Sequence, residues 1–581
     1  MNWKHVALVC GMSGAFSALA FVPGLTSAGN QKRWDLSGAN ASVHTNIVNR
    51  NSRAIRYFLA TDAWSTTNTA AELNALRASF AQWQSVSGTV LKFEEAGPVA
   101  PGVDVNTSDH SNVVFWAKTS TIVNGGLNNI SGALGVTFSS FFSDGTFVEG
   151  DIVFNGVLYG WFTDASTTTN HFIEGTALHE MGHFIGLDHS PLGGATMFAS
   201  SASGISSDAG LSTDDISGAR FLYAQTNQAA LRGTLRGSVT RNGTNVFGAA
   251  IVAEGTNGTV VAGTVTRTNG IYELSALLPG SYLVRAVPLD SSNAVEWLAR
   301  GRDISSTYAG AESGFLATTN VPVTLTAGVT NTLNFAVVAA EPAFRITNIR
   351  LATANPGSFS WSSLPIVMSQ GRSNLTVGVA SANLPTNNAT LSISGDGLTV
   401  GPTVFRTNAF GTGLNFISVL LSIASNATPG LRTFLVQQGT NTAYANGFLD
   451  VIPTRPDYNF DGLDDLFQRQ YFPLWTATNA APSADPDGDG FNNASEYVAG
   501  TSPTNAASLL RIDQVMQTMA GTTITWRSVA GKRYQVSSRN LFGAGAWQTI
   551  GAPVTASGPS ANYFDAGANS GQRFYRVEVL P

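Results

Sequence analysis

The segment Ala177-Leu-His-Glu-Met-Gly-His-Phe-Ile-Gly-Leu-Asp-His-Ser190 decides how the first third of the chain is interpreted. His179 and His183 are four residues apart, so on a helix they lie on one face about one turn apart. Gly186 lets the chain leave that helix through a backbone conformation that is costly for other residues. The turn then returns His189 towards the same point, and three imidazoles are expected to meet there.

These spacings predict a metal site that does chemistry. Three neutral imidazole ligands leave one tetrahedral position open, which is the arrangement of a catalytic rather than a structural zinc. Glu180 directly follows the first ligand, so its carboxylate can reach the open position without binding the metal. We expect one Zn²⁺, with Glu180 as the general base that takes a proton from zinc-bound water and passes it to the leaving amine. An ordinary helix is the alternative, but Gly186 and His189 at fixed offsets make coincidence improbable.

Length and composition point to a folded protein of several domains. A chain of 581 residues is too long for one hydrophobic core, and three to five domains are expected. Hydrophobic residues make up 43% and charged residues 12%, which argues against disorder. The net charge of -6 comes without a Lys/Arg cluster, so nucleic acid is not an expected partner. No membrane span is expected after the N-terminus, because no later segment has about 18 uninterrupted apolar residues.

The N-terminus reads as a signal peptide. Lys4 supplies the positive charge, and an apolar stretch over 6–20 follows it. Cleavage could follow Ala20 or Ala28, and the second is preferred. A membrane anchor is the alternative, but the apolar run is short and interrupted by glycines. Cys10, the only cysteine, would be removed, so a secreted, extracellular chain without disulfides is expected.

The pattern along the chain divides it into six parts. A mixture of helix and strand signals covers the first part of the mature chain, with helices expected at 71–85 and at about 168–185, and a capping box at Ser212-Thr-Asp-Asp215 opening a last one. Strand patterns dominate beyond residue 224. The expected parts are a signal peptide at 1–28, a zinc domain at 29–224, β modules at 225–340 and 341–452, a calcium-binding segment at 453–505 and a C-terminal β module at 506–581.

The zinc motif, with Ser190 after the third ligand and Met197 eight residues beyond it, resembles the matrixin branch of the metzincin peptidases. Residues 150–154 and 211–218 resemble the family's strand before the active-site helix and its closing helix. The resemblance implies an α+β domain, with a twisted, mixed five-stranded sheet and three helices, that acts as a metalloendopeptidase. It also implies that Met197 lies beneath the metal.

The same resemblance implies where a substrate would lie. A protein or peptide substrate would align against an edge strand at 133–138, with Ala133, Leu134 and Gly135 at its start. Two departures from the family are visible. Residues 198–200 (Phe-Ala-Ser) lack the Pro and Tyr usual in the wall of the specificity pocket. The histidines of the family's structural zinc have no clear counterparts, which is why only one zinc is expected.

The rest of the chain resembles accessory modules. Residues 268–284 resemble the carboxypeptidase regulatory-like family of β-sandwiches, and 341–452 are immunoglobulin-like in strand spacing only. The expected fold class is therefore a multidomain chain in which the α+β metzincin domain is followed by β-sandwich modules and a short calcium-binding segment.

A Ca²⁺ site is expected in the Asp-rich segment. The EF-hand pattern of oxygen ligands and glycine fits Asp485, Asp487, Asp489, Phe491 (through its carbonyl), Asn493 and Glu496. An incomplete second copy, which resembles dockerin repeats, is formed by Asp457, Asn459, Asp461 and Asp465, with Gln468 where Glu is expected. Whether this second copy binds calcium is left open.

Two functions remain after this reading. The first is a secreted endopeptidase that acts on extracellular proteins. The second is an adhesive or matrix-binding protein whose zinc domain is vestigial or only self-processing, with extracellular matrix or polysaccharide as ligand of the β modules. Trp526, Trp547 and Tyr575 could stack on sugars, although core packing is the preferred reading. A monomer is expected, and the intact His and Glu residues favour the peptidase.

Overall fold

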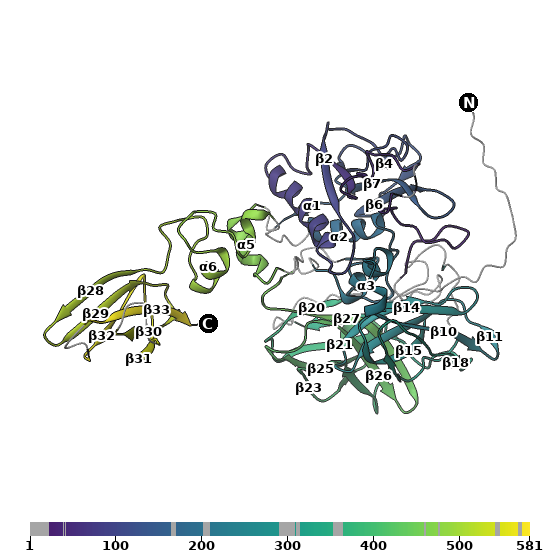
Figure 1. Cartoon of the computed structure of the whole chain (residues 1–581). Coiled ribbons are helices and arrows are strands. Elements are labelled where there is room, and N and C mark those ends of the chain that lie inside the picture. The colour runs from purple at the N-terminus through teal and green to yellow at the C-terminus, as the bar shows by residue number, and fades with distance from the viewer. Residues whose placement is uncertain are drawn as a thin grey trace. The chain divides into compact units, whose positions relative to one another are not determined.

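The computed structural model describes residues 22–38, 40, 42–163, 170–201, 210–289, 308, 314–352, 364–457, 461–473, 477–540, 546–567 and 572–580. Met1–Thr454 and Arg455–Pro581 form two compact units, which are taken one at a time (Figure 1). Most of the expected signal peptide lies outside the described residues. Within the described ranges, no helix has the length and apolar character needed to cross a membrane.

The first unit begins with a mixed five-stranded sheet in the order β2-β1-β3-β7-β6. The central strands β3 and β7 are buried almost throughout, as expected for strands that are covered on both faces. β6 runs antiparallel to β7 and forms one edge of this sheet, whereas the other pairs are parallel. The bounds are β1 (Ile55–Ala60), β2 (Phe93–Val99), β3 (Val113–Ala117), β6 (Gly135–Phe141) and β7 (Phe147–Asn155).

Three helices belong to this part of the chain: α1 (Thr69–Gln84), α2 (Ile173–Phe184) and α3 (Thr213–Leu222). α1 and α2 pack against the five-stranded sheet, whereas α3 packs on strands that lie beyond residue 224. α1 buries Leu76, Phe80 and Trp83, which lie at helical spacing, and the Trp83 indole donates to the carbonyl of Leu178 on α2 at 3.0 Å. α2 starts later than expected, because 171–172 pair as strand β9 (His171–Phe172) with β8 (Trp161–Phe162). The capping box expected at Ser212 is confirmed at the start of α3.

Two buried aromatic side chains cap the C-terminal end of α2. The last carbonyls of a helix lack partners within it. Here the Trp34 indole donates to Phe184 O at 2.7 Å, and the Tyr223 hydroxyl donates to Ile185 O at 2.7 Å. Gly186 follows with φ +103°, where a Cβ would lie 2.1 Å from the carbonyl oxygen of Lys32. Only glycine fits this turn, so the chain leaves α2 in one direction.

The segment after residue 21 is packed into the first unit. Gly24 N donates to Gly186 O at 2.8 Å, and Pro23 forms an antiparallel bridge with Leu187. Val22 is buried in a small apolar cluster. Cleavage after Ala28, the preferred reading of the sequence, would remove this strand from the turn that leads to His189, whereas cleavage after Ala20 would keep it.

The two expected β modules share one sheet. This eight-stranded sheet has the order β16-β15-β12-β13-β26-β27-β20, with β22 on β26, and Val260 of β13 pairs with Leu431 of β26. The boundary expected at 340/341 therefore does not separate two independent bodies. The bounds are β12 (Ala249–Gly255), β13 (Val260–Val265), β15 (Gly280–Pro288), β16 (Val321–Leu325), β20 (Ile366–Ser369), β22 (Thr390–Ile393), β26 (Gly430–Gln438) and β27 (Asn441–Ile452).

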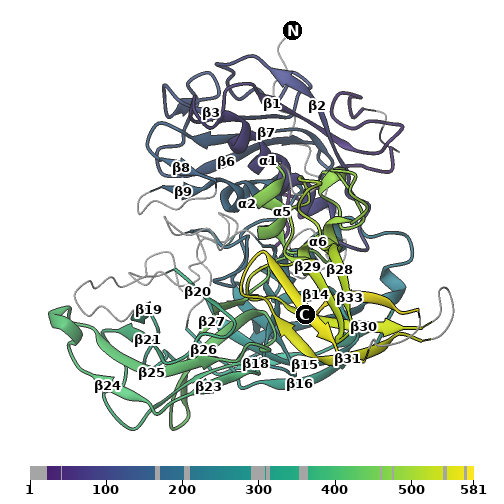
Figure 2. The ribbon, with the colours of Figure 1, turned by 90° about the vertical axis from the view of Figure 1, so that its left-hand side faces the viewer.

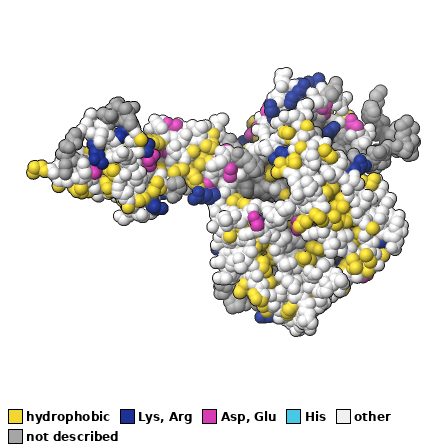
Figure 3. Space-filling model, turned by 60° about the horizontal axis from the view of Figure 1, so that its bottom comes forward, with side chains coloured by type: hydrophobic (Ala, Val, Ile, Leu, Met, Phe, Trp, Pro, Cys, Tyr) yellow, Lys and Arg dark blue, Asp and Glu magenta, His cyan; other side chains and the backbone are white. Residues whose placement is uncertain are grey.

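Two further sheets complete this β body, and α3 lies between it and the five-stranded sheet (Figure 1). The first contains β10 (Gly233–Arg241), β11 (Thr244–Asn245), β14 (Ile271–Leu277), β17 (Thr330–Thr332) and β18 (Phe335–Val337). The second contains β19 (Asn348–Ala352), β21 (Leu375–Ser381), β23 (Leu398–Val400), β24 (Val404–Arg406) and β25 (Asn415–Ile423). Charged side chains are sparse on the face of this body in Figure 3.

The interior joins the β body to the helices. One hydrophobic core contains Trp83 of α1 and Met181 of α2 together with Leu235 of β10. Between the β modules, the Arg285 guanidinium is buried and contacts the Glu254 carboxylate at 2.7 Å and the Asn446 amide oxygen at 2.6 Å. The first unit is therefore held together by apolar packing and by a buried ion pair.

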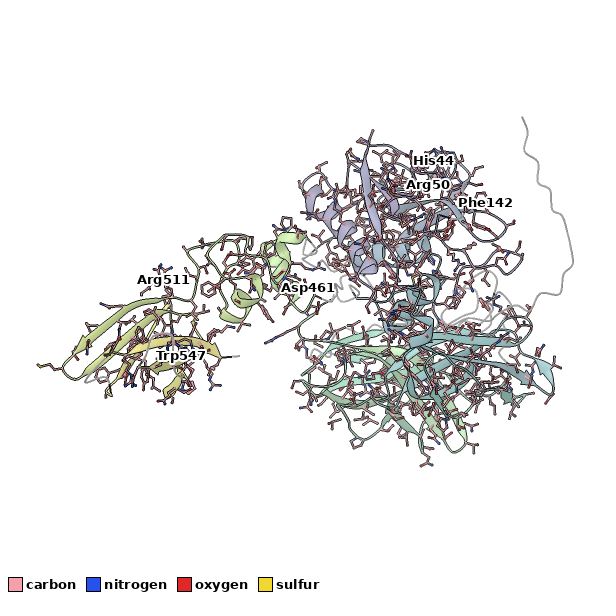
Figure 4. All side chains as sticks on the ribbon, viewed as in Figure 1. His44, Arg50, Phe142, Asp461, Arg511 and Trp547 are labelled. Carbon is pink, nitrogen blue, oxygen red and sulfur yellow. The ribbon has the colours of Figure 1, made fainter. Side chains whose placement is uncertain are left out.

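The second unit contains two short helices, α5 (Asp465–Tyr471) and α6 (Asn493–Ala499), and two three-stranded sheets. Trp526 and Tyr534 are buried between the sheets, so Trp526 packs in the core and cannot stack on a sugar. The guanidinium groups of Arg539 and Arg576 lie over the ring of Trp547, 4.5 and 5.0 Å from its centroid (Figure 4 labels Trp547). The strands are β28 (Ile512–Thr518), β29 (Gly521–Arg527), β30 (Arg533–Arg539), β31 (Gln548–Thr555), β32 (Ser560–Asp565) and β33 (Phe574–Leu580).

Candidate metal centre and active site

The structure brings His179, His183 and His189 together, with one nitrogen of each ring within 4.8 Å of the others. His179 and His183 come from consecutive turns of α2, and His189 comes from the turn that follows Gly186. The Nε2 atoms of His183 and His189 are 3.2 Å apart. His44 and His110 stack on each other elsewhere (Figure 4 labels His44) and do not belong to this group.

Backbone carbonyls fix the orientation of two of the rings. His179 Nδ1 lies 2.7 Å from Thr196 O, and His183 Nδ1 lies 2.9 Å from Leu187 O. A carbonyl oxygen can only accept, so each Nδ1 carries the hydrogen and each Nε2 presents its lone pair. Burial, together with the two neighbouring imidazoles, lowers the pKa of His183 and keeps this ring neutral. The donor set therefore fits a divalent ion that prefers imidazole nitrogen, such as zinc.

Glu180 lies in the same cavity as the three histidines, which has a volume of about 720 Å³. Its side chain is buried, and burial raises the pKa of its carboxyl group. The Thr137 hydroxyl on β6 lies 2.8 Å from both Glu180 Oε2 and Glu180 O. This contact holds the carboxylate in place. The sequence predicted Thr137 only as part of the edge strand at 133–138, and nothing in it links the Thr137 hydroxyl to Glu180.

The expected substrate strand also borders this cavity. Ala133, Leu134 and Gly135 all line it, although β6 itself starts only at Gly135. A Cβ on Gly135 would lie 2.8 Å from Glu180 Cγ, so β6 runs directly against the acidic side chain. The edge strand and the candidate general base are thus in contact.

Met197 is buried beneath α2, where its Sδ lies 2.1 Å from the position that a Cβ on Gly182 would take. The turn that carries it is fixed by Asp215 of the capping box, whose carboxylate accepts from Thr196 N at 2.9 Å and from Met197 N at 3.1 Å. The sequence indicated the capping box, but not this second use of Asp215.

Asp214 links the turn after the metal ligands to the first β module. Its buried carboxylate accepts from the Ser190 hydroxyl at 2.7 Å and from Gly263 N on β13 at 2.8 Å. Burial and the neighbouring Asp215 raise the pKa of Asp214 to about 7. In the sequence Asp214 belongs to the pattern of the closing helix, and its contact with Gly263 is not visible there.

In the second unit, the EF-hand-like loop brings carboxylates together. Asp485, Asp487 and Asp489 each place a carboxylate oxygen within 4.8 Å of the others. Asp487 Oδ2, Asp489 Oδ2 and Asn493 Oδ1 are buried without a hydrogen-bond partner, and the buried Glu496 carboxylate lies beside these groups. Phe491 is 38% exposed at the surface of the loop. Buried acceptors that lack donors fit a bound cation such as calcium.

The other Asp-rich loop is organised by the chain's own donors. Asp457 accepts from Asp461 N and Gly462 N, both at 3.0 Å. The Gln468 amide donates to Asp461 Oδ2 at 2.8 Å, where the complete loop has Glu496 (Figure 4 labels Asp461). Asp465 is buried at the start of α5, and Asn459 lies outside the described residues.

Comparison with known proteins identifies one part of the chain. Residues 49–224 match the family model described as Matrixin, which supports a metallopeptidase domain there. No curated protein matches the chain. The N-terminal and C-terminal parts outside this range are not covered by the family model.

Among solved structures, the chain is similar to pilins at a low level. The minor pilin GBS52 of Streptococcus agalactiae is 14% identical, with 19% of this chain and 46% of that chain covered and a TM-score of 0.14. The major pilin subunit BcpA of Bacillus cereus is 11% identical, with 39% and 70% covered and a TM-score of 0.14. The chain thus spans less than half of the length of the first of these, and such scores carry no inference about fold or function.

Proposed function

We propose that the matrixin-like metallopeptidase domain at residues 49–224 is a zinc-dependent endopeptidase that hydrolyses peptide bonds of extracellular proteins. The observation that carries this proposal is the convergence of three imidazole nitrogens in the cavity that also holds the buried Glu180 carboxylate. A structural site would fill all four positions around the ion with protein ligands, and no fourth His, Cys, Asp or Glu ligand joins the three in the described ranges.

The residues divide the work between binding and proton transfer. His179, His183 and His189 would hold Zn²⁺, which when bound supplies Lewis acidity to the scissile carbonyl and lowers the pKa of water. Glu180 would take the proton from the attacking water and deliver it to the leaving amine nitrogen. Its raised pKa favours holding that proton between the two transfers. Thr137 keeps the carboxylate in position.

The edge of the five-stranded sheet would align the substrate. An extended peptide can add to an exposed strand through main-chain hydrogen bonds, and β6 is the edge strand that borders the cavity. Ala133, Leu134 and Gly135 would thus guide the peptide past Glu180. The role of these residues is binding and orientation, not chemistry.

We also propose that one Ca²⁺ binds at 485–496 and that the protein is exported as a monomer. The unpartnered buried oxygens of the loop support the calcium site. The signal-like N-terminus supports export, and the packing of Val22 and Pro23 against the first unit supports cleavage after Ala20. The adhesive reading, in which the β modules bind extracellular matrix or polysaccharide, remains the alternative function.

The test uses the full chain after its N-terminal processing, beside the variant Glu180→Ala. Metal content is measured by mass spectrometry, and cleavage is measured on casein, gelatin and a broad peptide library. We expect about one zinc in both proteins and cleavage only by the wild type. If zinc-loaded wild type cuts nothing, the peptidase proposal fails, and the β modules are then tested for binding to matrix proteins and polysaccharides.

A further inference from the structure

The loop that follows the third histidine is held by strands outside the matched domain. We call residues 190–198 the post-ligand loop. Gly193 N donates to Asn446 O at 3.0 Å, and Gly194 N donates to Gly447 O at 2.9 Å. Both acceptors belong to β27 of the second β module. The backbone of the post-ligand loop therefore takes its position from a strand more than two hundred residues later in the chain.

Side-chain packing makes this attachment tight. Leu192 is fully buried with Val252, Val260 and Leu431, which come from three strands of the shared sheet. A Cβ on Gly193 would lie 2.5 Å from a ring carbon of Phe448, so a larger residue could not approach β27 as closely. The β body thus acts as a rigid support for the loop that connects His189 with Met197.

The same strand reaches the cavity through an aromatic contact. Phe198 lines the cavity and packs edge-to-face on Phe448 of β27, with ring centroids 5.5 Å apart. Phe198 is also the first residue of the stretch that lacks the Pro and Tyr found in this place in matrixins. The part of the specificity-pocket wall that those residues would form is therefore built here in another way.

Strand β20 and the residues before it form another part of the cavity wall. Leu364, Pro365 and Val367 line the cavity that contains the histidines. Side chains alternate along a strand, and Ile366 and Met368 point the other way into the hydrophobic core of the second module. β20 and β27 lie on the side of the β body that faces α2 (Figures 1 and 2).

This wall is mainly apolar where it meets the cavity. Asp450, the partner of Val367 in the β20–β27 register, also lines the cavity, and it interacts electrostatically with the buried Arg432. The Arg432 guanidinium thus balances part of the charge of the Asp450 carboxylate within the second β module. Phe198, Leu364, Pro365 and Val367 offer hydrocarbon surfaces to a ligand.

We infer that the second β module forms one wall of the substrate cleft, and that this wall selects a large apolar side chain at one position of an extended peptide. The inference rests on the proposed peptidase function. It adds specificity-determining residues, Val367 foremost, that lie outside the domain carrying the metal ligands. An apolar pocket that gains or loses volume changes discrimination between side chains by about tenfold or more.

The experiment compares Val367→Trp with Ser369→Trp in the full, zinc-loaded chain. The two positions face the same side of β20, but Ser369 does not line the cavity, so the second variant controls for added bulk on the strand. We expect Val367→Trp to lower kcat/KM about tenfold for peptides with Leu or Phe at the selected position, relative to the same peptides with Ala. Ser369→Trp should leave that ratio unchanged.

A second readout does not depend on turnover. Two peptide hydroxamates, one with an isobutyl and one with a methyl side chain, are titrated into each zinc-loaded protein by calorimetry. We expect the affinity ratio between them to fall about tenfold in Val367→Trp and to stay constant in Ser369→Trp. If the affinity ratio is the same in Val367→Trp and Ser369→Trp and both keep their zinc, the inference that the second β module forms a wall of the cleft is wrong. If the wild type binds the hydroxamates but cuts no peptide, the peptidase proposal fails. The affinity ratios of the two variants then still test whether Val367 contacts the apolar side chain of the ligand.

Discussion

Replacing Gly135 with alanine should disable Glu180 without disturbing the fold. The added Cβ would lie 2.8 Å from Glu180 Cγ, 2.9 Å from Oε1 and 3.0 Å from Cδ. Carbon atoms in contact prefer a separation of about 3.5–4.0 Å. The backbone of β6 fixes the position of the new Cβ, so the Glu180 carboxylate is the group that must move, by about 0.5–1 Å.

A displacement of that size is large for catalysis and small for folding. Misplacing a reacting group by about 1 Å can cost about a hundredfold in rate, which corresponds to about 2.7 kcal/mol. Alanine in place of a strand glycine with ordinary backbone angles stabilises the folded state by about 0.5–1 kcal/mol. We therefore expect Gly135→Ala to lower kcat by about ten- to a hundredfold while the melting temperature stays the same or rises.

The assay measures kcat, KM, zinc content and melting temperature for Gly135→Ala beside Gly132→Ala. Gly132 lines the same cavity, but nothing lies within 4 Å of its would-be Cβ, so it is a matched control. Activity in Gly135→Ala equal to that of Gly132→Ala would refute the assigned contact between β6 and Glu180. Loss of zinc in Gly135→Ala would instead show that the added methyl group disturbs the ligands.

Two further predictions concern charge. Burial and the nearby aspartates raise the pKa of Glu496 to about 7 in the metal-free loop. Below this pH, Ca²⁺ must displace a proton from the carboxyl group in order to bind. The affinity for Ca²⁺ should therefore fall about tenfold per pH unit below 7 and level off above it. Calorimetric titrations with CaCl₂ at pH 6 and pH 8 check this, and equal affinities at both values would contradict it. Arg285→Met leaves the Glu254 carboxylate buried without its cation, which should cost about 3–5 kcal/mol of unfolding free energy, measured by urea denaturation. Adding Glu254→Gln should recover part of that loss, and a single variant as stable as wild type would count against the buried pair.

The features that could be predicted from the sequence are those set by short spacings. His179 and His183 share one face of α2 because a helix repeats every 3.6 residues, and Gly186 brings His189 back within a single turn. The capping box at Ser212 follows the same logic, because all its partners lie within one turn of helix. The Asp residues of the EF-hand-like loop are likewise close in the chain.

The contacts that could not be predicted join distant segments. Thr137 reaches Glu180 across the sheet, and Asp214 reaches Gly263 in another module. The shared eight-stranded sheet depends on the pairing of Val260 with Leu431, and alternating strand patterns do not specify which strands become neighbours. The change in composition along the chain suggests a row of modules, but it does not indicate that one sheet runs through two of them.

The attachment of the post-ligand loop to β27 has a consequence for how the enzyme is made. A ribosome completes the segment 177–190 long before it reaches β27 (Asn441–Ile452), and chains fold as they emerge. The nascent chain therefore carries its histidines and Glu180 while the loop beside them still lacks its anchor. This order of synthesis delays the anchoring of the post-ligand loop until nearly the whole first unit has been translated.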